Sequence, residues 1–235
     1  MNKSTVNEIK ERFDNEVERF SNLETGQVST IDAKLSLELI TEAANRVVPG
    51  AKTLLDLGCG AGNYTLKMLS KNKNLRCTLL DLSRPMLDRA YERVSAETSG
   101  VVEVLQGDIR DVELNENYFD IILAGAVLHH LREDADWEFV FGKLYRILKP
   151  GGCLMISDLI TQDTEELSNY IKEKYGEYLE SQGGAKYRMY VQDYVAREDS
   201  PRSLNYQLDL MKKLGYSKTE ILHKNICFAA YCGIK

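Results

Sequence analysis

The feature that most constrains the fold is an alternation of strand-like and helix-like segments from about Lys52 to Ile160. Short apolar runs, typical of buried strands, are followed by amphipathic stretches with helical periodicity. Five strands are expected in this region, at residues 52–58, 75–82, 101–108, 118–131 and 153–160. Strands and helices that alternate at this spacing predict a parallel sheet with helices on both faces. The ligand crevice of such a sheet lies at the carboxyl ends of its strands.

The two ends of the chain add further elements to this core. Residues 219–225 and 226–235 read as two strands with almost no connection between them, so they must pair antiparallel. Two amphipathic helices are expected before the first strand, at residues 4–23 and 29–47. Because these helices precede the repeating pattern, they are candidates for a lid or for a packing layer.

The predicted fold is a Rossmann-like α/β domain, a doubly wound seven-stranded sheet that is mostly parallel with its last strand antiparallel. Residues 1–48 would form an N-terminal helical extension that packs on the core, and residues 49–235 the domain itself. The polar, tyrosine-rich stretch 161–200 interrupts the alternation and is predicted to be a helical lid that bends at Gly183-Gly184.

A glycine-rich turn joins the first strand to its helix and carries the strongest functional signal. Gly58, Gly60 and Gly62 alternate there, which allows a ligand to approach the backbone where any Cβ would collide. A dinucleotide fingerprint needs its third glycine at the position of Asn63. The third glycine comes one residue early, so the spacing disfavours a nicotinamide cofactor.

Three acidic residues stand at the carboxyl ends of predicted strands. Asp81 follows the glycine turn by some 20 residues, where a carboxylate can accept both hydroxyls of a ribose. Asp108 ends the third strand and could accept from an adenine amino group, and Asp56 lies beside the turn, near the amino-acid end of such a ligand. Three carboxylates around one glycine turn indicate a nucleoside-type ligand. Capping of the next helix is the other role open to Asp81, although Ser83 is better placed for it.

The motifs DLGCGAG, LLDLS, QGDI and LHHL…LKPGG resemble the ordered motifs of class I S-adenosylmethionine-dependent methyltransferases over roughly residues 50–160. The resemblance implies S-adenosylmethionine as cofactor. It also implies that Gly58, Gly60 and Gly62 line the methionine portion, that Asp81 holds the ribose, and that Leu82 lies beside the adenine.

The same resemblance assigns positions further along the chain. Asp108 and Ile109 would bracket the adenine, and Ala124 would face the sulfonium at the end of the fourth strand. Relatives with an N-terminal helical extension close the site with an aromatic or basic residue, a role that Arg19 and Phe20 could take here.

A narrower resemblance concerns both ends of the chain. RFDNEVERFSNLETGQ and LMKKLGY…FAAYCG resemble the group around carboxy-S-adenosylmethionine synthase of tRNA wobble-uridine modification. That group places an arginine before the last strand pair, where this chain has Asp209-Leu210-Met211, and its glycine turn differs at the position of Gly60. These departures favour ordinary methyl transfer.

Two histidines follow the fourth strand, where an acceptor would lie. His129 is the candidate general base because imidazole titrates near neutral pH, and the other role open to it is packing of the loop. His130 is the weaker candidate. His129, His130 and His223 lack the usual spacing of metal ligands, so no metal site is predicted.

Six tyrosines crowd the predicted lid, at positions 170, 175, 178, 187, 190 and 194. They would form a half-buried packing face, the wall of a pocket for an aromatic or cationic acceptor, or both. The lid would close over a small, partly apolar acceptor and exclude water from the transferred methyl group.

Composition limits the partners and the compartment. A net charge of −6 disfavours broad binding to a phosphate backbone, so a small-molecule acceptor is expected and nucleic acid is not. Five cysteines without CxxC pairs indicate reduced thiols, and neither a signal peptide nor a membrane span is recognised, so a cytoplasmic location is expected. The sequence leaves open whether the protein forms a homodimer.

The sequence therefore predicts an enzyme that moves a methyl group from S-adenosylmethionine to a small molecule by in-line displacement. Two alternatives stay open: a carboxy-S-adenosylmethionine synthase-like enzyme, and a non-catalytic subunit that binds the cofactor. The intact glycine turn and Asp81 disfavour the second alternative.

Overall fold

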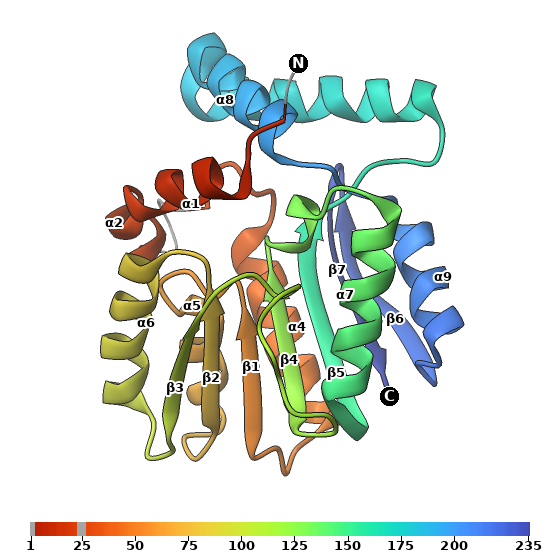
Figure 1. Cartoon of the computed structure of the whole chain (residues 1–235). Coiled ribbons are helices and arrows are strands. Elements are labelled where there is room, and N and C mark those ends of the chain that lie inside the picture. Colours follow the sequence, from red (N-terminus) through yellow and green to blue (C-terminus); the bar gives the residue numbers. More distant parts are fainter. Residues whose placement is uncertain (1–2, 23–26) are drawn as a thin grey trace.

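The computed structural model describes residues 3–22 and 27–235. The parts of the predicted N-terminal extension and helix at 1–2 and 23–26 lie outside the described residues. The seven strands are β1 (Thr53–Leu57), β2 (Arg76–Asp81), β3 (Val102–Gln106), β4 (Phe119–Gly125), β5 (Leu148–Leu159), β6 (Lys218–Asn225) and β7 (Phe228–Ile234). They form one sheet in the order β3-β2-β1-β4-β5-β7-β6 (Figure 1).

Strand directions agree with the predicted fold. The first five strands pair parallel, and β7 pairs antiparallel with both β5 and β6. The strand order reverses between β1 and β4, which places the ligand crevice of a doubly wound sheet at the carboxyl ends of these two strands.

Helices cover both faces of the sheet (Figure 1). One apolar core lies under α4 (Ala33–Val47), α5 (Asn63–Leu69) and α6 (Arg84–Glu97), and the other under α7 (Asp134–Ile147) and α9 (Leu204–Leu214). Strand β1 shows why both faces are filled: Leu54 faces the first core and Leu55 the second. This arrangement confirms the Rossmann-like α/β prediction.

Short polar side chains and a glycine cap the ends of two helices. The Ser83 hydroxyl accepts from the Met86 N–H at the start of α6, and the Ser203 hydroxyl accepts from Tyr206 at the start of α9. Gly215 ends α9 with a φ of +101°, the left-handed conformation that favours glycine.

The N-terminal segment departs from the single helix predicted at 4–23. Two helices, α1 (Val6–Asp14) and α2 (Val17–Ser21), are separated where the backbone of Glu16 leaves the helical region. The Glu16 carboxylate is bound by Arg12 and by Arg19, on its two sides. The sequence left open whether the N-terminal helices form a lid or a packing layer. Helices α1 and α2 lie as a cover, whereas α4 packs on the sheet.

The predicted lid is α8 (Glu165–Glu198), which lies across the carboxyl ends of the strands (Figure 1). Its helical geometry breaks at Gly184, where φ is +75°, so two helical arms fold back on each other as the Gly183-Gly184 pair predicts. A third apolar cluster, which includes Tyr175, Leu179 and Phe228, joins these arms to the top of β7.

Candidate active site

The glycine turn after β1 has the backbone conformation that its residues suggest. Gly58 has a φ of +63° and Gly60 of +50°. A Cβ on Gly58 would lie 2.5 Å from a methyl group of Val127, whereas a Cβ on Gly60 would meet nothing within 4 Å. Gly58 is therefore required by a protein neighbour, and Gly60 faces open space into which a ligand can come close.

Gly62 packs against a protein neighbour, whereas the sequence predicts contact with the methionine portion. It precedes α5 with a φ of +82°, and a Cβ there would lie 3.1 Å from Val94 on α6. It does not line the cavities around the turn. The third glycine thus permits close packing against α6, and its contact with the methionine portion stays a prediction.

Asp81 lies at the end of β2, against the glycine turn. One carboxylate oxygen accepts from the Gly60 N–H at 2.8 Å and the other accepts from the Ser83 N–H at 2.9 Å. Burial raises the pKa of this carboxyl, although the backbone N–H groups oppose the rise. Asp81 is thus held in place from two sides, and with Leu82 it lines the crevice as predicted.

Asp56 lies behind the turn and not in the crevice. Its side chain is buried in the sheet, where one oxygen accepts from the hydroxyl of Thr65 at 2.6 Å and from its N–H at 3.2 Å. Burial raises the pKa of Asp56 to about 7. The predicted cofactor contact is wrong because the strand directs this side chain toward α5.

Two adjoining cavities form the cofactor crevice. The loop cavity, about 110 Å³, lies around Gly58, Gly60 and Asp81. The outer cavity, about 300 Å³, shares Gly58 and Asp81 and reaches Asp108 and Ile109, as the predicted order of ligand contacts requires. A larger open cavity of about 660 Å³ lies between β3 and α7, but it includes neither the glycine turn nor the strand-end acids.

Asp108 enters this crevice with its carboxylate already bound. Arg110 donates to one oxygen at 2.9 Å and to the other at 2.6 Å. Burial would raise the pKa of Asp108, but the hydrogen bonds from Arg110 hold it below its ordinary value. Contact of Asp108 and Ile109 with an adenine stays a prediction.

The end of β4 differs from the prediction by one or two residues. Ala124 is fully buried and does not line the crevice, so it cannot face a sulfonium. Gly125 and Ala126 line the loop cavity instead. A Cβ on Gly125 would lie 2.4 Å from the ring of Tyr64, so this glycine makes room for a tyrosine that the sequence analysis did not single out.

A third cavity, the cover cavity, lies beside the loop cavity and under α8. Its volume is about 90 Å³, and it shares Phe20, Ala126 and His130 with the loop cavity. Phe20 reaches both cavities, as expected for a residue that closes the site. Arg19 lines the cover cavity and neither of the two cavities of the cofactor crevice. Its predicted contact with the cofactor stays a prediction.

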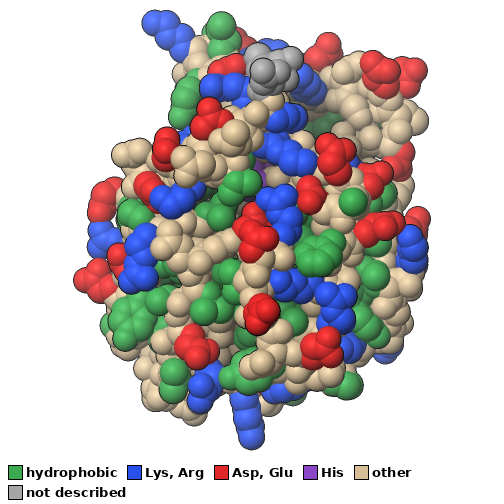
Figure 2. Space-filling view, viewed as in Figure 1, with side chains coloured by type: hydrophobic (Ala, Val, Ile, Leu, Met, Phe, Trp, Pro, Cys, Tyr) green, Lys and Arg blue, Asp and Glu red, His purple; other side chains and the backbone are tan. Residues whose placement is uncertain are grey.

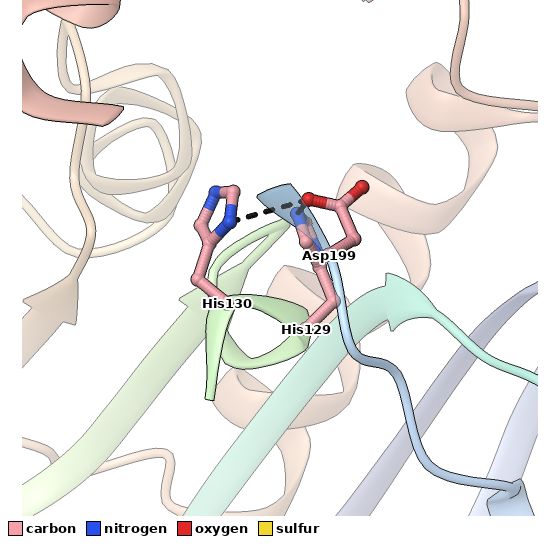
Figure 3. A group of neighbouring side chains, drawn as sticks. All are labelled: His129, His130 and Asp199. Atoms are coloured by element: carbon pink, nitrogen blue, oxygen red, sulfur yellow. Dashed lines mark ion pairs between the residues drawn. The ribbon is translucent and has the colours of Figure 1, made fainter. Parts of the chain in front are cut away.

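The two neighbouring histidines differ in their surroundings. His129 is buried, and its Nδ1 contacts the carboxylate of Asp158, which also accepts from the backbone N–H groups of Leu128 and His129. His130 lines all three cavities, and its Nε2 has no hydrogen-bond partner among the described residues. Both rings point toward Asp199, which follows α8 (Figure 3).

The electrostatics of His129 weaken its prediction as a general base. Burial would lower its pKa, but the carboxylates of Asp158 and Asp199 prevail and raise it to about 9. An imidazole with that pKa is mostly protonated at neutral pH and cannot accept a further proton. His223 lies apart on β6, 2.8 Å from a carboxylate oxygen of Asp32, so the grouping of three histidines considered from the sequence does not form.

The tyrosines of α8 divide between packing and cavity lining. Tyr175 and Tyr194 line the cover cavity, and both of their hydroxyls bond to Ser29. Tyr170 and Tyr190 are exposed. The segment therefore combines both roles that the sequence left open.

The cover is fastened to the N-terminus by long-range contacts that the sequence did not indicate. The Arg12 guanidinium binds the buried Glu198 carboxylate with Nε at 2.9 Å and Nη2 at 2.6 Å. The Ser4 N–H donates to the carbonyl of Arg197 at 3.0 Å. Helix α1 and the end of α8 thus form one closed structure over the crevice.

Comparison with known proteins agrees with this geometry. Residues 54–152 match a family model described as a methyltransferase domain. The chain is 29% identical to a carboxy-S-adenosyl-L-methionine synthase from Mannheimia succiniciproducens over 82% of this chain and 80% of the relative. It is 25% identical to the same enzyme from Campylobacter lari over 85% of this chain and 84% of the relative.

Solved structures share the fold at lower identity. The N-methyltransferase NodS from Bradyrhizobium japonicum, in complex with S-adenosyl-L-homocysteine, has a TM-score of 0.65 at 14% identity, with 96% of this chain and 97% of that chain covered. Human N-acetylserotonin methyltransferase in complex with SAM has a TM-score of 0.60 at 16% identity, with 95% of this chain covered. This chain spans 57% of the human protein's length.

The fold, the crevice and the matched domain together define a class I S-adenosylmethionine-dependent methyltransferase. The chain is an enzyme, and its cofactor is S-adenosylmethionine. Both curated relatives described above carry the name carboxy-S-adenosyl-L-methionine synthase. No helix in the described part of the chain is both long and apolar enough to cross a membrane.

Proposed function

We propose that this enzyme transfers the methyl group of S-adenosylmethionine to a small molecule bound in the cover cavity. The observation that carries the proposal is the wall shared by the loop cavity and the cover cavity, which is formed by Phe13, Phe20, Gln27, Ala126 and His130. A cofactor in the crevice and an acceptor under α8 would meet at this wall. In-line displacement needs that kind of alignment and little further chemistry from the protein.

The size and charge of the site favour a small acceptor. The cover cavity has a volume of about 90 Å³ and lies beneath α1 and α8, which are joined by the Arg12–Glu198 ion pair. Positive and negative side chains are intermixed over the face in Figure 2, without a broad field of Lys and Arg for a phosphate backbone. The five free cysteines are buried thiols, which supports a reducing, cytoplasmic setting.

Calorimetry with S-adenosylhomocysteine tests the cofactor site. We expect binding of this product, no binding of nicotinamide dinucleotides, and a loss of about 1.5–3 kcal/mol of binding free energy in Asp81→Ala, the range for hydrogen bonds to a charged group. Asp88→Ala is the matched control, because Asp88 lies on the exposed side of α6 in an ion pair with Arg84. Equal affinity of folded Asp81→Ala and wild type would exclude the ribose role of Asp81.

A carboxy-S-adenosylmethionine synthase-like activity is the second candidate, and the curated relatives favour it. The residues at the position of that group's arginine oppose it. Leu210 and Met211 are buried in the sheet core, and Asp209 pairs with Lys212. Any carboxylate would have to be held elsewhere, and the two cations that line the cover cavity, Arg12 and Arg19, are both paired with Glu16. Mass spectrometry of the nucleoside that co-purifies with the enzyme separates the two candidates, since only the second predicts carboxy-S-adenosylmethionine.

A further inference from the structure

His129, His130 and Asp199 bring three metal-ligating groups together at the wall of the cover cavity (Figure 3). Nε2 of His129 lies 3.6 Å and Nδ1 of His130 lies 3.3 Å from the same carboxylate oxygen of Asp199. These separations are long for N–H···O hydrogen bonds. Two ligand atoms bound tetrahedrally to one zinc ion at about 2.0 Å are about 3.3 Å apart. Each histidine nitrogen is thus near that separation from Asp199, and all three ligand atoms lie within 4.8 Å of one another.

The structure also holds these side chains in the orientation that ligation needs. Asp158 contacts Nδ1 of His129 and accepts from the Leu128 N–H at 2.8 Å, which directs Nε2 toward Asp199. The Ser200 N–H donates to the carbonyl of His129 at 2.7 Å and ties the two segments together. A carboxylate behind a ligating histidine is the usual outer support of a metal site.

The charge around the cluster is compatible with a divalent cation. Asp158 and Asp199 are buried, at 2% and 6% exposure. The nearby Arg12 is committed to Glu198 and Glu16, and Lys3 donates to the backbone carbonyl of Asp199 rather than to its carboxylate. A divalent ion bound between the histidines and Asp199 would displace the proton that His129 otherwise carries and would take its place in balancing the two buried carboxylates.

We propose that His129, His130 and Asp199 bind one divalent transition-metal ion of the zinc type, with an open coordination position toward the cover cavity. Three protein ligands and one open position are the arrangement of catalytic zinc sites. The role of the metal rests on the proposed function: the open position would take the hydroxyl or thiol of the acceptor. Coordination would release the acceptor proton to solvent. The acceptor atom then forms its bond to the methyl carbon as the carbon–sulfur bond breaks, and S-adenosylhomocysteine leaves with the electron pair on sulfur.

Zinc binding to the chelator-stripped full chain tests this site without knowledge of the acceptor. Equilibrium dialysis and calorimetry with Zn²⁺ alone should show one ion per chain in wild type, and Co²⁺ should give visible absorption bands typical of nitrogen and oxygen ligands. Asp199→Asn and His129→Asn should abolish both signals. Asp158→Asn should weaken zinc binding about 10- to 100-fold, the usual effect of a lost outer support.

His223→Ala is the matched control, since His223 pairs with Asp32, is not one of the three grouped side chains, and should leave metal binding unchanged. Circular dichroism and S-adenosylhomocysteine binding establish that each variant is folded. Absence of stoichiometric zinc in a wild type that binds S-adenosylhomocysteine would overturn the metal site and leave the methyltransferase proposal standing. Undiminished zinc in Asp199→Asn and His129→Asn would overturn it as well. Zinc binding without S-adenosylhomocysteine binding would instead contradict the cofactor site alone.

Discussion

Asp56 couples the stability of the glycine turn to pH at the scale of a single residue. Burial raises its pKa to about 7, although Thr65 donates to it. An unfolded aspartate titrates near pH 3.9, so the folded protein retains a proton that the unfolded chain has lost. The stability from this group is fully present below the unfolded pKa and is lost as the pH rises through the folded value.

Asp56→Asn should remove this dependence, because the amide does not titrate. Between pH 5 and pH 8, wild type should lose about 2–3 kcal/mol of unfolding free energy relative to the variant. Urea denaturation at the two pH values measures the difference. Asp120→Asn is the control: hydrogen bonds from Lys149 and from the backbone hold the pKa of Asp120 below its ordinary value despite burial, so its contribution is fully present at both pH values and this variant should keep the pH dependence of wild type. The same pH dependence in wild type and Asp56→Asn would show that Asp56 is ionised.

A residue's position at the end of a strand does not by itself predict whether its side chain lines the crevice. Asp81 and Asp56 both lie on strands next to the glycine turn, but only Asp81 lines the crevice, because the carboxylate of Asp56 bonds to Thr65 on α5. Ala124 was placed one residue too early for the same reason, since the pleat decides which residue of a strand end faces the ligand. The motif locates the crevice, and the side-chain direction selects its lining.

At the scale of elements, the cover formed by α1 and α8 is held in place by its own set of contacts. Helix α8 joins the top of the sheet through a small apolar cluster and joins α1 through the Arg12–Glu198 ion pair. Breaking a buried ion pair by removing one charge leaves the other uncompensated, at a cost of about 3–5 kcal/mol. Because the pair lies between cover elements and outside the sheet, the cost should appear as local opening.

Hydrogen exchange measures this opening. In wild type, residues 161–200 should exchange faster than β1 and β4 and gain protection when S-adenosylhomocysteine binds. Glu198→Gln should reduce protection in α1 and α8 and leave the sheet unchanged. Arg46→Gln breaks an exposed pair with Glu42 and should have little effect, as surface pairs contribute about 0–1 kcal/mol. A cover as protected as the sheet, and unresponsive to ligand, would mean static packing.

Across the whole molecule, local patterns predicted most of the fold. The helix cap at Ser83 and the strand alternation depend on neighbours in sequence, and the structure confirms them. The convergence of His129 and His130 on Asp199 could not be predicted in this way, because about 70 residues separate the partners and their meeting depends on how α8 folds back at Gly184. The sequence therefore predicts the cofactor side of the proposed site, whereas the proposed acceptor side is apparent only in the structure.

The last strand of the chain holds the sheet together. Strand β7 lies between β5 and β6, where Tyr231 is opposite both Ile156 and Ile221. The Tyr231 ring is fully buried, and its hydroxyl donates to the buried Gln207 of α9. Since this side chain joins the sheet to a covering helix, its loss should affect the whole domain and not only the C-terminus.

Tyr231→Ala should lower the free energy of unfolding by about 3–5 kcal/mol, the range for deleting a large buried aromatic side chain. Tyr231→Phe should cost about 1–3 kcal/mol, because it leaves Gln207 without its donor. Ile221→Ala is the matched control: this neighbour on β6 is 53% exposed and should change stability by less than about 1 kcal/mol. Thermal unfolding followed by circular dichroism, with S-adenosylhomocysteine binding as a second probe, should show one cooperative transition that moves to lower temperature in Tyr231→Ala. If β6 and β7 were lost first while binding persisted, the C-terminal hairpin would be an independent unit rather than part of the domain core.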